Sequence, residues 1–419
     1  MQHPLYIPRA RLLDPAFGRD ELGELYINAE GFIDDAPPAL PANCTVLDET
    51  EGALLVTPGL CDVHVHFRDP GQTQAEDLFS GAAAAARGGF TRVVTMPNTS
   101  PATDSPELVR RTRRTIGPVA IYPSACCTRS RAGKEPADLE ALVEAGAVCF
   151  TDDGAMVSNP EVMAEVMTRA KALGRVVMDH AVRPDIQQGG VVRACPAAER
   201  YGLKVFPAEA EVQAVVDDLA SCRRTGCALH IQHISCAQTV RLVQEARERE
   251  GLPVTAEVTP HHLALCAEEI PGDDANWRMN PPLGLRSDRD ALRAALRSGV
   301  LKIFATDHAP HTPQSKSQGF AKGPFGIIGL ETAFAVSWHE MVVREGMRAL
   351  DWAEAWITRP NALIGLEPPT LARGARAEIA LFRPERPWRV DPERFASKSR
   401  NSPWAGQTLQ GVSLGALRA

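Results

Sequence analysis

Two histidines separated by one valine, His64 and His66, close an apolar run at residues 59–65. If this run is a β-strand, both imidazoles point to the same side, because alternate side chains of a strand share a face. Such a pair can supply two ligands to a metal ion, although two half-buried histidines can equally be packed structural residues. The pair predicts a metal site only if other parts of the chain supply further ligands.

Further candidate ligands follow other apolar runs. Asp152 and Asp153 come directly after residues 147–151, and His180 ends the next run. Two later runs close with the remaining candidates, which are His233, Asp307, His308 and His311. A lone histidine at a strand end is more often a satisfied structural residue, but imidazoles together with carboxylates are ligands that suit zinc. The whole set therefore predicts a metal centre, provided that the strand ends meet.

The number of apolar runs indicates an architecture in which the strand ends meet. Eight runs are predicted to be strands, at residues 60–65, 91–95, 119–122, 147–151, 176–179, 228–233, 254–258 and 301–305. Between them lie helical patterns with a glycine near their ends, at residues 77–87, 160–173, 209–223, 237–249 and 288–297. Eight strand–helix units in about 300 residues predict an α/β fold of the (β/α)8 TIM-type barrel, whose strands all end at one shared mouth.

The two ends of the chain differ from this α/β region. Five short pieces there are strand-like, at residues 25–27, 45–47, 53–57, 377–382 and 408–414. We therefore expect a small β-rich domain formed from both chain ends, residues 1–57 and 366–419, beside a barrel domain at 58–365. The last residues show no convincing strand pattern, so one strand of the small domain is expected to be missing.

The composition limits the class of protein. There are 45 Lys and Arg against 52 Asp and Glu, a formal net charge of −7 without long blocks of one sign, which argues against a nucleic-acid binder. The ten cysteines are scattered through apolar contexts, as expected for a reduced cytoplasmic protein. No signal-peptide pattern opens the chain, and no apolar run approaches the roughly 18 residues of a membrane span. We expect neither secretion nor membrane insertion.

Six motifs carry a resemblance to a known family: His64-Val-His66-Phe-Arg68-Asp-Pro-Gly71, Met96-Pro-Asn98-Thr99, Phe150-Thr-Asp-Asp153-Gly154, His233-Ile-Ser235, Met279-Asn280-Pro-Pro282 and Ala305-Thr-Asp307-His-Ala-Pro-His311. Together they resemble the class I dihydroorotases of the amidohydrolase superfamily. The resemblance runs from the first barrel strand to about Thr332. Many amidohydrolases share the His-x-His pair and the final aspartate, whereas Arg68, Asn98 and His311 are what the dihydroorotase resemblance implies for a small carboxylated substrate.

The resemblance implies a site for one or two zinc ions, with a substrate site beside it. The implied metal ligands are His64, His66, Asp153, His180, His233 and Asp307. The implied substrate-binding residues are Arg68, Asn98, Asn280 and His311. Related hydantoinases and allantoinases place a carboxylated lysine where the fourth strand ends, whereas this chain has two aspartates there. Adjacent strand residues point to opposite faces, so only one of Asp152 and Asp153 is expected to bridge.

The implied activity is that of a zinc-dependent dihydroorotase, the reversible cyclisation of N-carbamoyl-L-aspartate to L-dihydroorotate in pyrimidine biosynthesis. A metal-bound hydroxide would attack the ring amide, and Asp307 would act first as general base and then as general acid. The guanidinium of Arg68 can bind a substrate carboxylate through two parallel hydrogen bonds. Its alternative is a salt bridge to the adjacent Asp69.

Two alternative functions stay open at this stage. One is another cyclic amidohydrolase, of the hydantoinase or allantoinase type. The other is a non-catalytic dihydroorotase-like scaffold for aspartate carbamoyltransferase, although a scaffold would not need all six ligand positions filled, as they are here. The resemblance also leaves open a homodimer and an association of an active enzyme with aspartate carbamoyltransferase.

Three further expectations concern single segments. After His180 this chain has Ala181 and Val182 where many superfamily members have acidic residues, so the hydrogen-bonded support of this ligand is expected to differ. Residues 312–325 show neither helical nor strand periodicity, and we expect either a mobile loop over the mouth or a long solvated connection. The other histidines are expected to be packing, surface or supporting residues, namely His3, His230, His261, His262 and His339.

Overall fold

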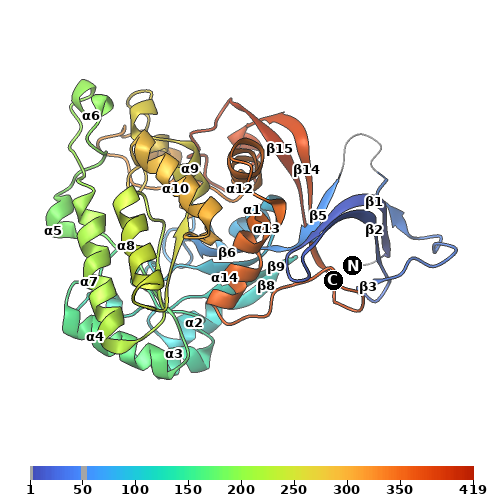
Figure 1. Ribbon diagram of the computed structural model, residues 1–419, viewed down its shortest axis with the longest axis horizontal. Helices are drawn as coiled ribbons and strands as arrows, with labels where there is room; N and C mark the ends of the chain where they lie inside the picture. Colours follow the sequence, from blue (N-terminus) through green and yellow to red (C-terminus); the bar gives the residue numbers. More distant parts are fainter. Residues whose placement is uncertain (1–2, 49–53) are drawn as a thin grey trace.

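Parallel strands covered by helices form the centre of the molecule in the computed structural model, which describes residues 3–48 and 54–419 (Figure 1). One sheet contains β6 (Leu60–Val65), β7 (Phe90–Thr95) and β9 (Val119–Pro123), with β8 (Arg114–Ile116) antiparallel at its edge. The other contains β10 (Val177–Asp179), β11 (Leu229–Ile231), β12 (Val254–Val258) and β13 (Ile303–Phe304). Nearly every residue of the parallel strands is buried, as expected for strands covered on both faces.

Isolated bridges link the two sheets on both sides. Phe150 forms parallel bridges with Ala125 and Val177, and His308 forms one with Val65. The predicted strand at 147–151 is therefore present as a single bridging residue rather than a ladder, because the chain turns directly afterwards at Asp153 and Gly154. The eight-stranded closed barrel stays a prediction.

Two other predicted strands are shorter than expected at the end that carries polar residues. The strand predicted at 228–233 ends at Ile231, and the strand predicted at 301–305 covers only Ile303–Phe304. The backbone φ is +28° at His233 and +46° at Asp307, which takes the chain out of the extended conformation. The polar side chains therefore sit on turns just beyond the ladders.

All five predicted helices are present, with ends that differ by at most two residues: α1 (Leu78–Gly88), α4 (Pro160–Ala172), α7 (Glu209–Thr225), α8 (Ala237–Glu248) and α10 (Arg286–Ser298). The side chain of Asp77 caps α1 by accepting hydrogen bonds from Phe79 N and Ser80 N, and Gly89 ends it at φ +94°. Periodicity did not predict the shorter helices, which include α2 (Pro106–Thr112), α3 (Leu139–Ala145), α5 (Pro184–Gln187), α6 (Pro196–Arg200), α9 (Pro260–Ala264), α11 (Pro313–Lys316), α12 (Ala333–Ser337), the π-helical η4 (Trp338–Arg344), α13 (Ala349–Trp356) and α14 (Thr358–Leu363).

A separate seven-stranded sheet joins the two ends of the chain, in the order β15-β14-β5-β1-β2-β3 with β4 beside β1. Its strands are β1 (Leu5–Asp14), β2 (Arg19–Ile27), β3 (Ile33–Asp34), β4 (Thr45–Val46), β5 (Leu55–Pro58), β14 (Glu378–Arg389) and β15 (Thr408–Arg418). Both termini lie at this sheet (Figure 1). It has its own apolar cluster, in which Leu12, Ile27 and Val56 meet Ile379.

The small sheet contains a strand that was expected to be missing and another that was not predicted. The expected lack of a strand is wrong, because β15 continues to Arg418 and pairs with β14 along its length. The long strand β1 has no counterpart in the sequence-based prediction, since one proline and two arginines interrupt its apolar alternation. Residue 53 of the piece predicted at 53–57 lies outside the described residues. The domain boundaries at 57 and 365 stay predictions.

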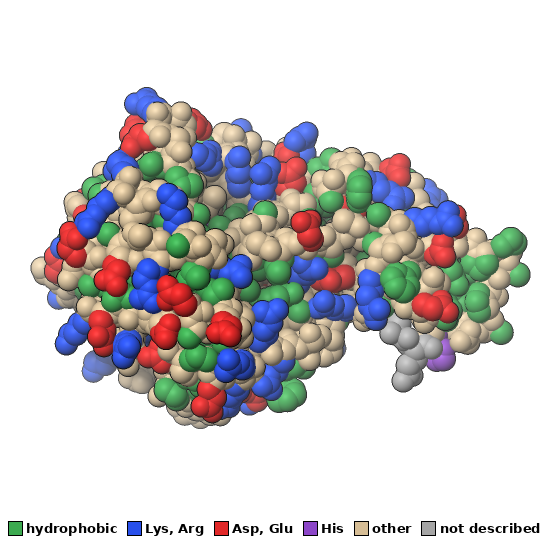
Figure 2. All heavy atoms as spheres, turned by 90° about the horizontal axis from the view of Figure 1, so that it is seen from below, with side chains coloured by type: hydrophobic (Ala, Val, Ile, Leu, Met, Phe, Trp, Pro, Cys, Tyr) green, Lys and Arg blue, Asp and Glu red, His purple; other side chains and the backbone are tan. Residues whose placement is uncertain are grey.

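The surface and the cysteines agree with the compositional expectations. Lys and Arg side chains are interspersed with Asp and Glu over the face seen in Figure 2. Among the described residues all ten cysteines are free thiols. No helix in the described part of the chain is long and apolar enough to cross a membrane.

Candidate active site

Nine of the ten predicted site residues line one cavity of about 170 Å³ beyond the carboxyl ends of the parallel strands. The tenth, His64, is fully buried against the cavity, with its Nε2 3.2 Å from Oδ1 of Asp153. The structure therefore brings together every predicted site residue from six separate strand ends and one loop, namely His64, His66, Arg68, Asn98, Asp153, His180, His233, Asn280, Asp307 and His311.

The imidazoles and carboxylates at the base of this cavity are close enough to share a ligand. Nε2 of His64 lies 3.5 Å from Oδ1 of Asp307, and Nε2 of His66 lies 2.9 Å from the same oxygen. Oδ1 of Asp153 lies 3.8 Å from Nδ1 of His180. Burial alone would raise the pKa of Asp307, but His64 and His66 hold it at about 2, so this carboxylate is ionised at neutral pH.

Two observations show that these residues fit a metal ion. Ligand atoms of His64, His66 and Asp307 lie within 4.8 Å of one another, as do those of His64, Asp153 and His233. Within the described residues, Nε2 of His64 and Nδ1 of His233 are buried without a hydrogen bond. Buried nitrogens and carboxylates aimed at a common point are costly unless a cation or proton joins them, and they are the donor set of zinc.

His180 differs from the other five predicted ligands. It belongs to neither group of three, and its Nδ1 lies 2.9 Å from Nε2 of His233. Its Nε2 accepts a hydrogen bond from Nδ2 of Asn280 at 2.9 Å. Asn280 from a distant loop thus supports this ring, and Ala181 and Val182 do not contribute a polar side chain.

The two neighbouring aspartates at the fourth strand end have separate surroundings. Asp153 lines the cavity, whereas Asp152 accepts hydrogen bonds from the backbone N–H (3.1 Å) and the hydroxyl of Thr128. Both carboxylates are buried. Of the two, Asp153 lines the cavity, as the resemblance implies, whereas its role as a bridging ligand stays a prediction.

Arg68 points into the cavity and away from its sequence neighbour. Its Nε donates to Pro310 O at 3.2 Å, while Asp69 is paired with Arg111 at 2.7 Å. The alternative salt bridge between Arg68 and Asp69 is therefore wrong. Burial lowers the pKa of Arg68 to about 10, so the guanidinium still carries its charge at neutral pH.

His311 completes this side of the cavity as a neutral donor. Its Nε2 lies 2.6 Å from Phe325 O and 3.4 Å from Nη2 of Arg68. Since a carbonyl oxygen only accepts, Nε2 carries the proton. Burial and the charge of Arg68 lower the pKa of His311 to about 3, which keeps the ring neutral.

Asn98 contacts the predicted metal ligands as well as the cavity. Its Nδ2 donates to Oδ2 of Asp153 at 2.9 Å, and its Oδ1 accepts from Nδ1 of His66 at 2.9 Å. This second contact leaves Nε2 of His66 free to face Asp307. Asn98 therefore orients one imidazole and one carboxylate from its place in the cavity wall.

Three site residues share an unusual backbone conformation. Arg68, His233 and Asp307 have φ of +55°, +28° and +46°, respectively. Positive φ is strained for residues other than glycine, and such strain persists where the surrounding structure holds it in place, often at functional sites. The turns at these strand ends are thus held in the orientation that points the side chains inward.

Sequence reasoning missed Glu257, a fully buried carboxylate on β12. Its Oε1 lies 2.6 Å from Nδ1 of His64 and accepts from His233 N at 3.2 Å, while its Oε2 lies 3.1 Å from Nε2 of His230. Burial alone would raise the pKa of Glu257, but His64 and His230 hold it below its usual range. A glutamate inside an otherwise apolar predicted strand was the signal that could have found it.

A second missed residue, Asp62, lies on β6 two positions before His64. Its carboxylate accepts from His64 N at 3.0 Å and from the hydroxyl of Thr306 at 2.5 Å. Asp62 thereby connects the strand end that carries His64 to the strand end that carries Asp307. Of the histidines assigned supporting roles, His230 is buried against Glu257, and His262 is bonded to Thr259 Oγ1 and Pro281 O.

The segment 312–325 is more ordered in its contacts than its sequence suggested. It begins with the short helix α11, and Nζ of the buried Lys316 donates to Ala275 O at 2.8 Å and to Pro324 O at 2.9 Å. The four residues of α11 form one helical turn, which is too short to give a period in the sequence, and a role of this segment as a mobile loop over the mouth stays a prediction. Phe325 at its end lines the cavity.

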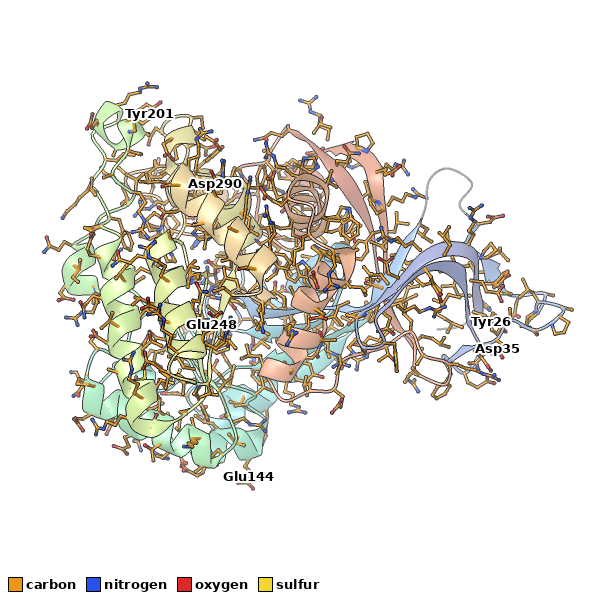
Figure 3. All side chains as sticks on the ribbon, in the orientation of Figure 1. Tyr26, Asp35, Glu144, Tyr201, Glu248 and Asp290 are labelled. Atoms are coloured by element: carbon orange, nitrogen blue, oxygen red, sulfur yellow. The ribbon has the colours of Figure 1, made fainter. Side chains whose placement is uncertain are left out.

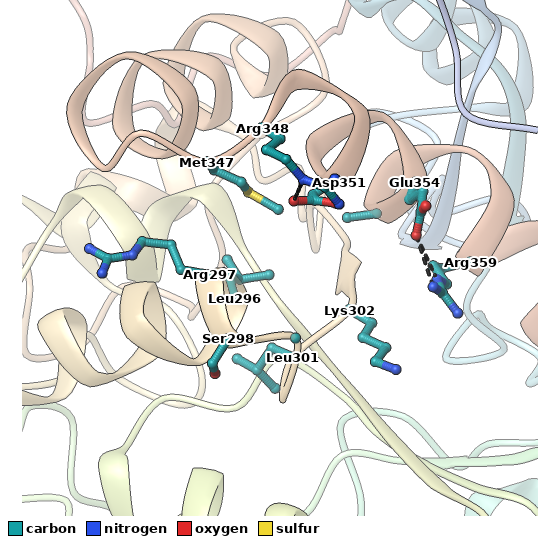
Figure 4. Close-up of a pocket in the computed structure, with 12 residues that line it drawn as sticks. Leu296, Arg297, Ser298, Leu301, Lys302, Met347, Arg348, Asp351, Glu354 and Arg359 are labelled. Atoms are coloured by element: carbon teal, nitrogen blue, oxygen red, sulfur yellow. Dashed lines mark hydrogen bonds and ion pairs between the residues drawn. The ribbon is translucent and has the colours of Figure 1, made fainter. Parts of the chain in front are cut away.

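A larger cavity of about 400 Å³ contains no predicted site residue (Figure 4). It lies at the opposite, amino-terminal end of β13, between α10 and α13. Its Arg348 is paired with Asp351 and its Arg359 with Glu354. Ligands of α/β sheets bind outside the carboxyl ends of the strands, so the smaller cavity is the candidate active site.

The chain is similar to known proteins along nearly its whole length. Residues 52–239 match a family described as Dihydro-orotase-like. A dihydroorotase from Bacillus caldolyticus is 45% identical over 377 residues, 89% of this chain and 87% of that protein. One from Pelotomaculum thermopropionicum is 39% identical over 411 residues, 97% of this chain and 95% of that protein.

Solved structures of more distant proteins share the fold. An L-hydantoinase (dihydropyrimidinase) from Arthrobacter aurescens superposes with a TM-score of 0.83 at 22% identity, covering 100% of this chain and 95% of that one. A dihydropyrimidinase from Brevibacillus agri has a TM-score of 0.82 at 22% identity, covering 99% and 94%. At this identity the likeness concerns the α/β fold alone, whereas the closer sequence relatives decide the family: the chain belongs to the dihydroorotases.

Proposed function

We propose that this protein is a dihydroorotase, a hydrolase of cyclic amides that interconverts N-carbamoyl-L-aspartate and L-dihydroorotate. The observation that carries the proposal is the pairing of two sites in one cavity of a dihydroorotase-family chain. A carboxylate-binding arginine and histidine, Arg68 and His311, lie 3.4 Å apart on one wall, and the imidazole–carboxylate cluster lies at the base. A small cyclic amide with one carboxylate matches this arrangement.

The fold behind this function is a (β/α)8 barrel at residues 58–365 with a small β domain from residues 1–57 and 366–419. The bridges at Phe150 and His308 support closure, because they connect the edges of the two parallel sheets on both sides. The separate apolar cluster of the seven-stranded sheet supports a distinct small domain. In a barrel, the six ligand positions lie at its C-terminal mouth, where such enzymes carry out their chemistry.

The residues proposed to hold one or two zinc ions are His64, His66, Asp153, His180, His233 and Asp307. A zinc ion bound there lowers the pKa of water to about 7 and polarises a carbonyl group. Glu257 accepts the proton of Nδ1 of His64, which leaves Nε2 as the ligand atom. Asn98 does the same for His66.

Asp307 is the proposed general base and acid. Its ionised carboxylate takes a proton from the nucleophilic water and returns it to the amide nitrogen as the ring C–N bond breaks. Arg68 and His311 hold the substrate carboxylate on the opposite wall, while Asn98 and Asn280 line the remaining sides. In the cyclising direction the same groups act in reverse, and water leaves.

Kinetics with a substrate panel test this function. We expect turnover of dihydroorotate and N-carbamoyl-aspartate, zinc in the purified protein, and a loss of about 100-fold or more in kcat for Asp307→Asn with the fold retained. Turnover of hydantoin or allantoin without turnover of dihydroorotate would point to the alternative amidohydrolase. A metal-free protein without any of these activities would point to a scaffold.

The cellular setting is also part of the proposal. On the family resemblance we propose a cytoplasmic location, a homodimer and an association with aspartate carbamoyltransferase, with no role for nucleic acid or membrane. Cell fractionation tests the location. Sedimentation velocity of the protein, alone and mixed with aspartate carbamoyltransferase, tests the two assemblies.

A further inference from the structure

The segment 396–402, which lies between β14 and β15 near the end of the chain, reaches the active-site wall. Four of its side chains are almost fully buried, those of Ser397, Ser399, Asn401 and Ser402. Polar side chains are buried where they are hydrogen-bonded, so their partners identify what the segment does. The partners of Asn401 lie on the cavity wall, and those of Ser397 and Ser399 lie on the loop that follows Arg68.

Asn401 uses its whole side chain to join two stretches of the cavity wall. Its Nδ2 donates to Ala309 O at 2.9 Å and to Gly326 O at 3.1 Å, and its Oδ1 accepts from His311 N at 3.2 Å. Its backbone carbonyl accepts from Ile328 N at 3.1 Å. Both amide protons and the amide oxygen are thus satisfied, in a residue that is 2% exposed.

These contacts bracket the carboxylate-binding pair. Asn401 holds Ala309 and His311 on either side of Pro310, whose carbonyl accepts the Nε proton of Arg68. On the other stretch it holds Gly326, next to Phe325, whose carbonyl accepts from Nε2 of His311. The hydrogen bonds that orient both Arg68 and His311 therefore end on backbone held by Asn401.

The rest of the segment is attached to the loop that follows Arg68. The hydroxyl of Ser399 donates to Ala75 O at 2.8 Å, and the hydroxyl of Ser397 donates to Oε2 of Glu76. These bonds lie away from the cavity, because none of the residues named in them lines it. Asn401 is thus the member of the segment that acts on the wall, and Ser399 offers a matched control.

We propose that Asn401 is a positioning residue for substrate binding: it sets the backbone at 309–311 and 326–328 and thereby the spacing and aim of Arg68 and His311. The inference rests on the proposed function, in which these two residues bind the substrate carboxylate. Two donors that bind one carboxylate must be placed accurately, since a misplacement of about 1 Å lowers the reaction rate on the order of 100-fold in comparable sites.

Asn401→Ala, Asn401→Asp and Ser399→Ala provide the test in the full-length zinc-loaded protein. We expect Asn401→Ala to raise the KM for dihydroorotate between about 10-fold and 100-fold, with kcat changed less than about 3-fold. Asn401→Asp keeps an acceptor for His311 N but loses both donors and places a carboxylate oxygen against two carbonyls, so its KM rises too. Ser399→Ala loses one buried hydrogen bond elsewhere, and its KM stays within about 2-fold.

Two measurements separate this inference from the function itself. Hydrogen exchange reports the His311 amide directly, and we expect faster exchange in Asn401→Ala than in Ser399→Ala. Calorimetry with orotate as a carboxylate probe reports the pocket without turnover, and we expect weaker binding in both Asn401 variants. A wild type that binds orotate but lacks dihydroorotase activity refutes the function and leaves the positioning role measurable. Unchanged KM and orotate affinity in folded Asn401→Ala refute the positioning role, even if exchange increases.

Discussion

Replacing Glu257 with glutamine should weaken zinc binding without disturbing the fold. The carboxylate accepts the Nδ1 proton of His64 at 2.6 Å and lies 3.1 Å from Nε2 of His230. Glutamine has the same shape, and its amide oxygen can still accept from His64. His230 can adapt by exchanging tautomers, because its Nδ1 lies 2.8 Å from the hydroxyl of Thr255, which can donate or accept. The variant therefore removes a negative charge rather than a contact.

The size of the effect follows from that charge. A carboxylate behind a metal-bound imidazole makes the ring a better ligand, and loss of such a partner typically weakens metal affinity by about 10- to 100-fold. This corresponds to about 1.4 to 2.7 kcal/mol of binding free energy. Because Glu257 is fully buried, water cannot replace the lost charge, and we expect the upper half of this range.

Competition with a chromogenic chelator measures the zinc affinity of each variant. Glu248→Gln is the matched control, because it makes the same chemical change on the exposed side of α8 (Figure 3). We expect Glu248→Gln to bind zinc like the wild type, and Glu257→Gln to recover most of its kcat when zinc is in excess. Circular dichroism checks that both variants are folded.

Equal zinc affinities for folded Glu257→Gln and wild type would refute the reasoning. Glu257 would then be a packing residue whose charge does not affect zinc binding by His64. A low kcat that excess zinc does not restore would also contradict it, since this would place Glu257 in the chemical step instead of behind the metal.

Three further changes are predicted. Arg68→Lys should raise the KM for dihydroorotate by about 100-fold, because an ammonium group cannot form the two parallel hydrogen bonds of a guanidinium; steady-state kinetics check it, and a KM within a few-fold of wild type would contradict it. Asp153→Asn should lose zinc, whereas Asp152→Asn should keep it, because only Asp153 faces the cluster; elemental analysis of both proteins decides, and equal zinc contents would contradict the assignment. Lys316→Met should lower the free energy of unfolding by about 2 to 4 kcal/mol, because it leaves the carbonyls of Ala275 and Pro324 unpaired and buried; urea denaturation measures this, with Lys134→Met as the exposed control.

The sequence predicted the helices better than the strands around the site. Long amphipathic patterns with capping residues, such as Asp77 and Gly89 around α1, are local signals and survive without tertiary information. The run at 147–151 has strand composition but makes only one bridging residue, because its hydrogen bonds are divided between neighbours that only the fold supplies. Strand β1 was missed because Pro8, Arg9 and Arg11 interrupt its apolar alternation, and its pairing with β2 is a tertiary contact.

The histidines and aspartates of the predicted site were found because they follow apolar runs, and parallel strands bring their ends together. Arg68, Asn98 and Asn280 were predicted only through the resemblance to the dihydroorotases. This periodicity, together with the residue types, determined the ligand chemistry and the family resemblance. Only the tertiary structure decided that Asp152 is bonded to Thr128, that Asp69 pairs with Arg111 instead of Arg68, and that Glu257 and Asn401 support the site. The physical reason is that these choices depend on contacts between residues from 24 to 193 positions apart in the chain, which local patterns do not encode.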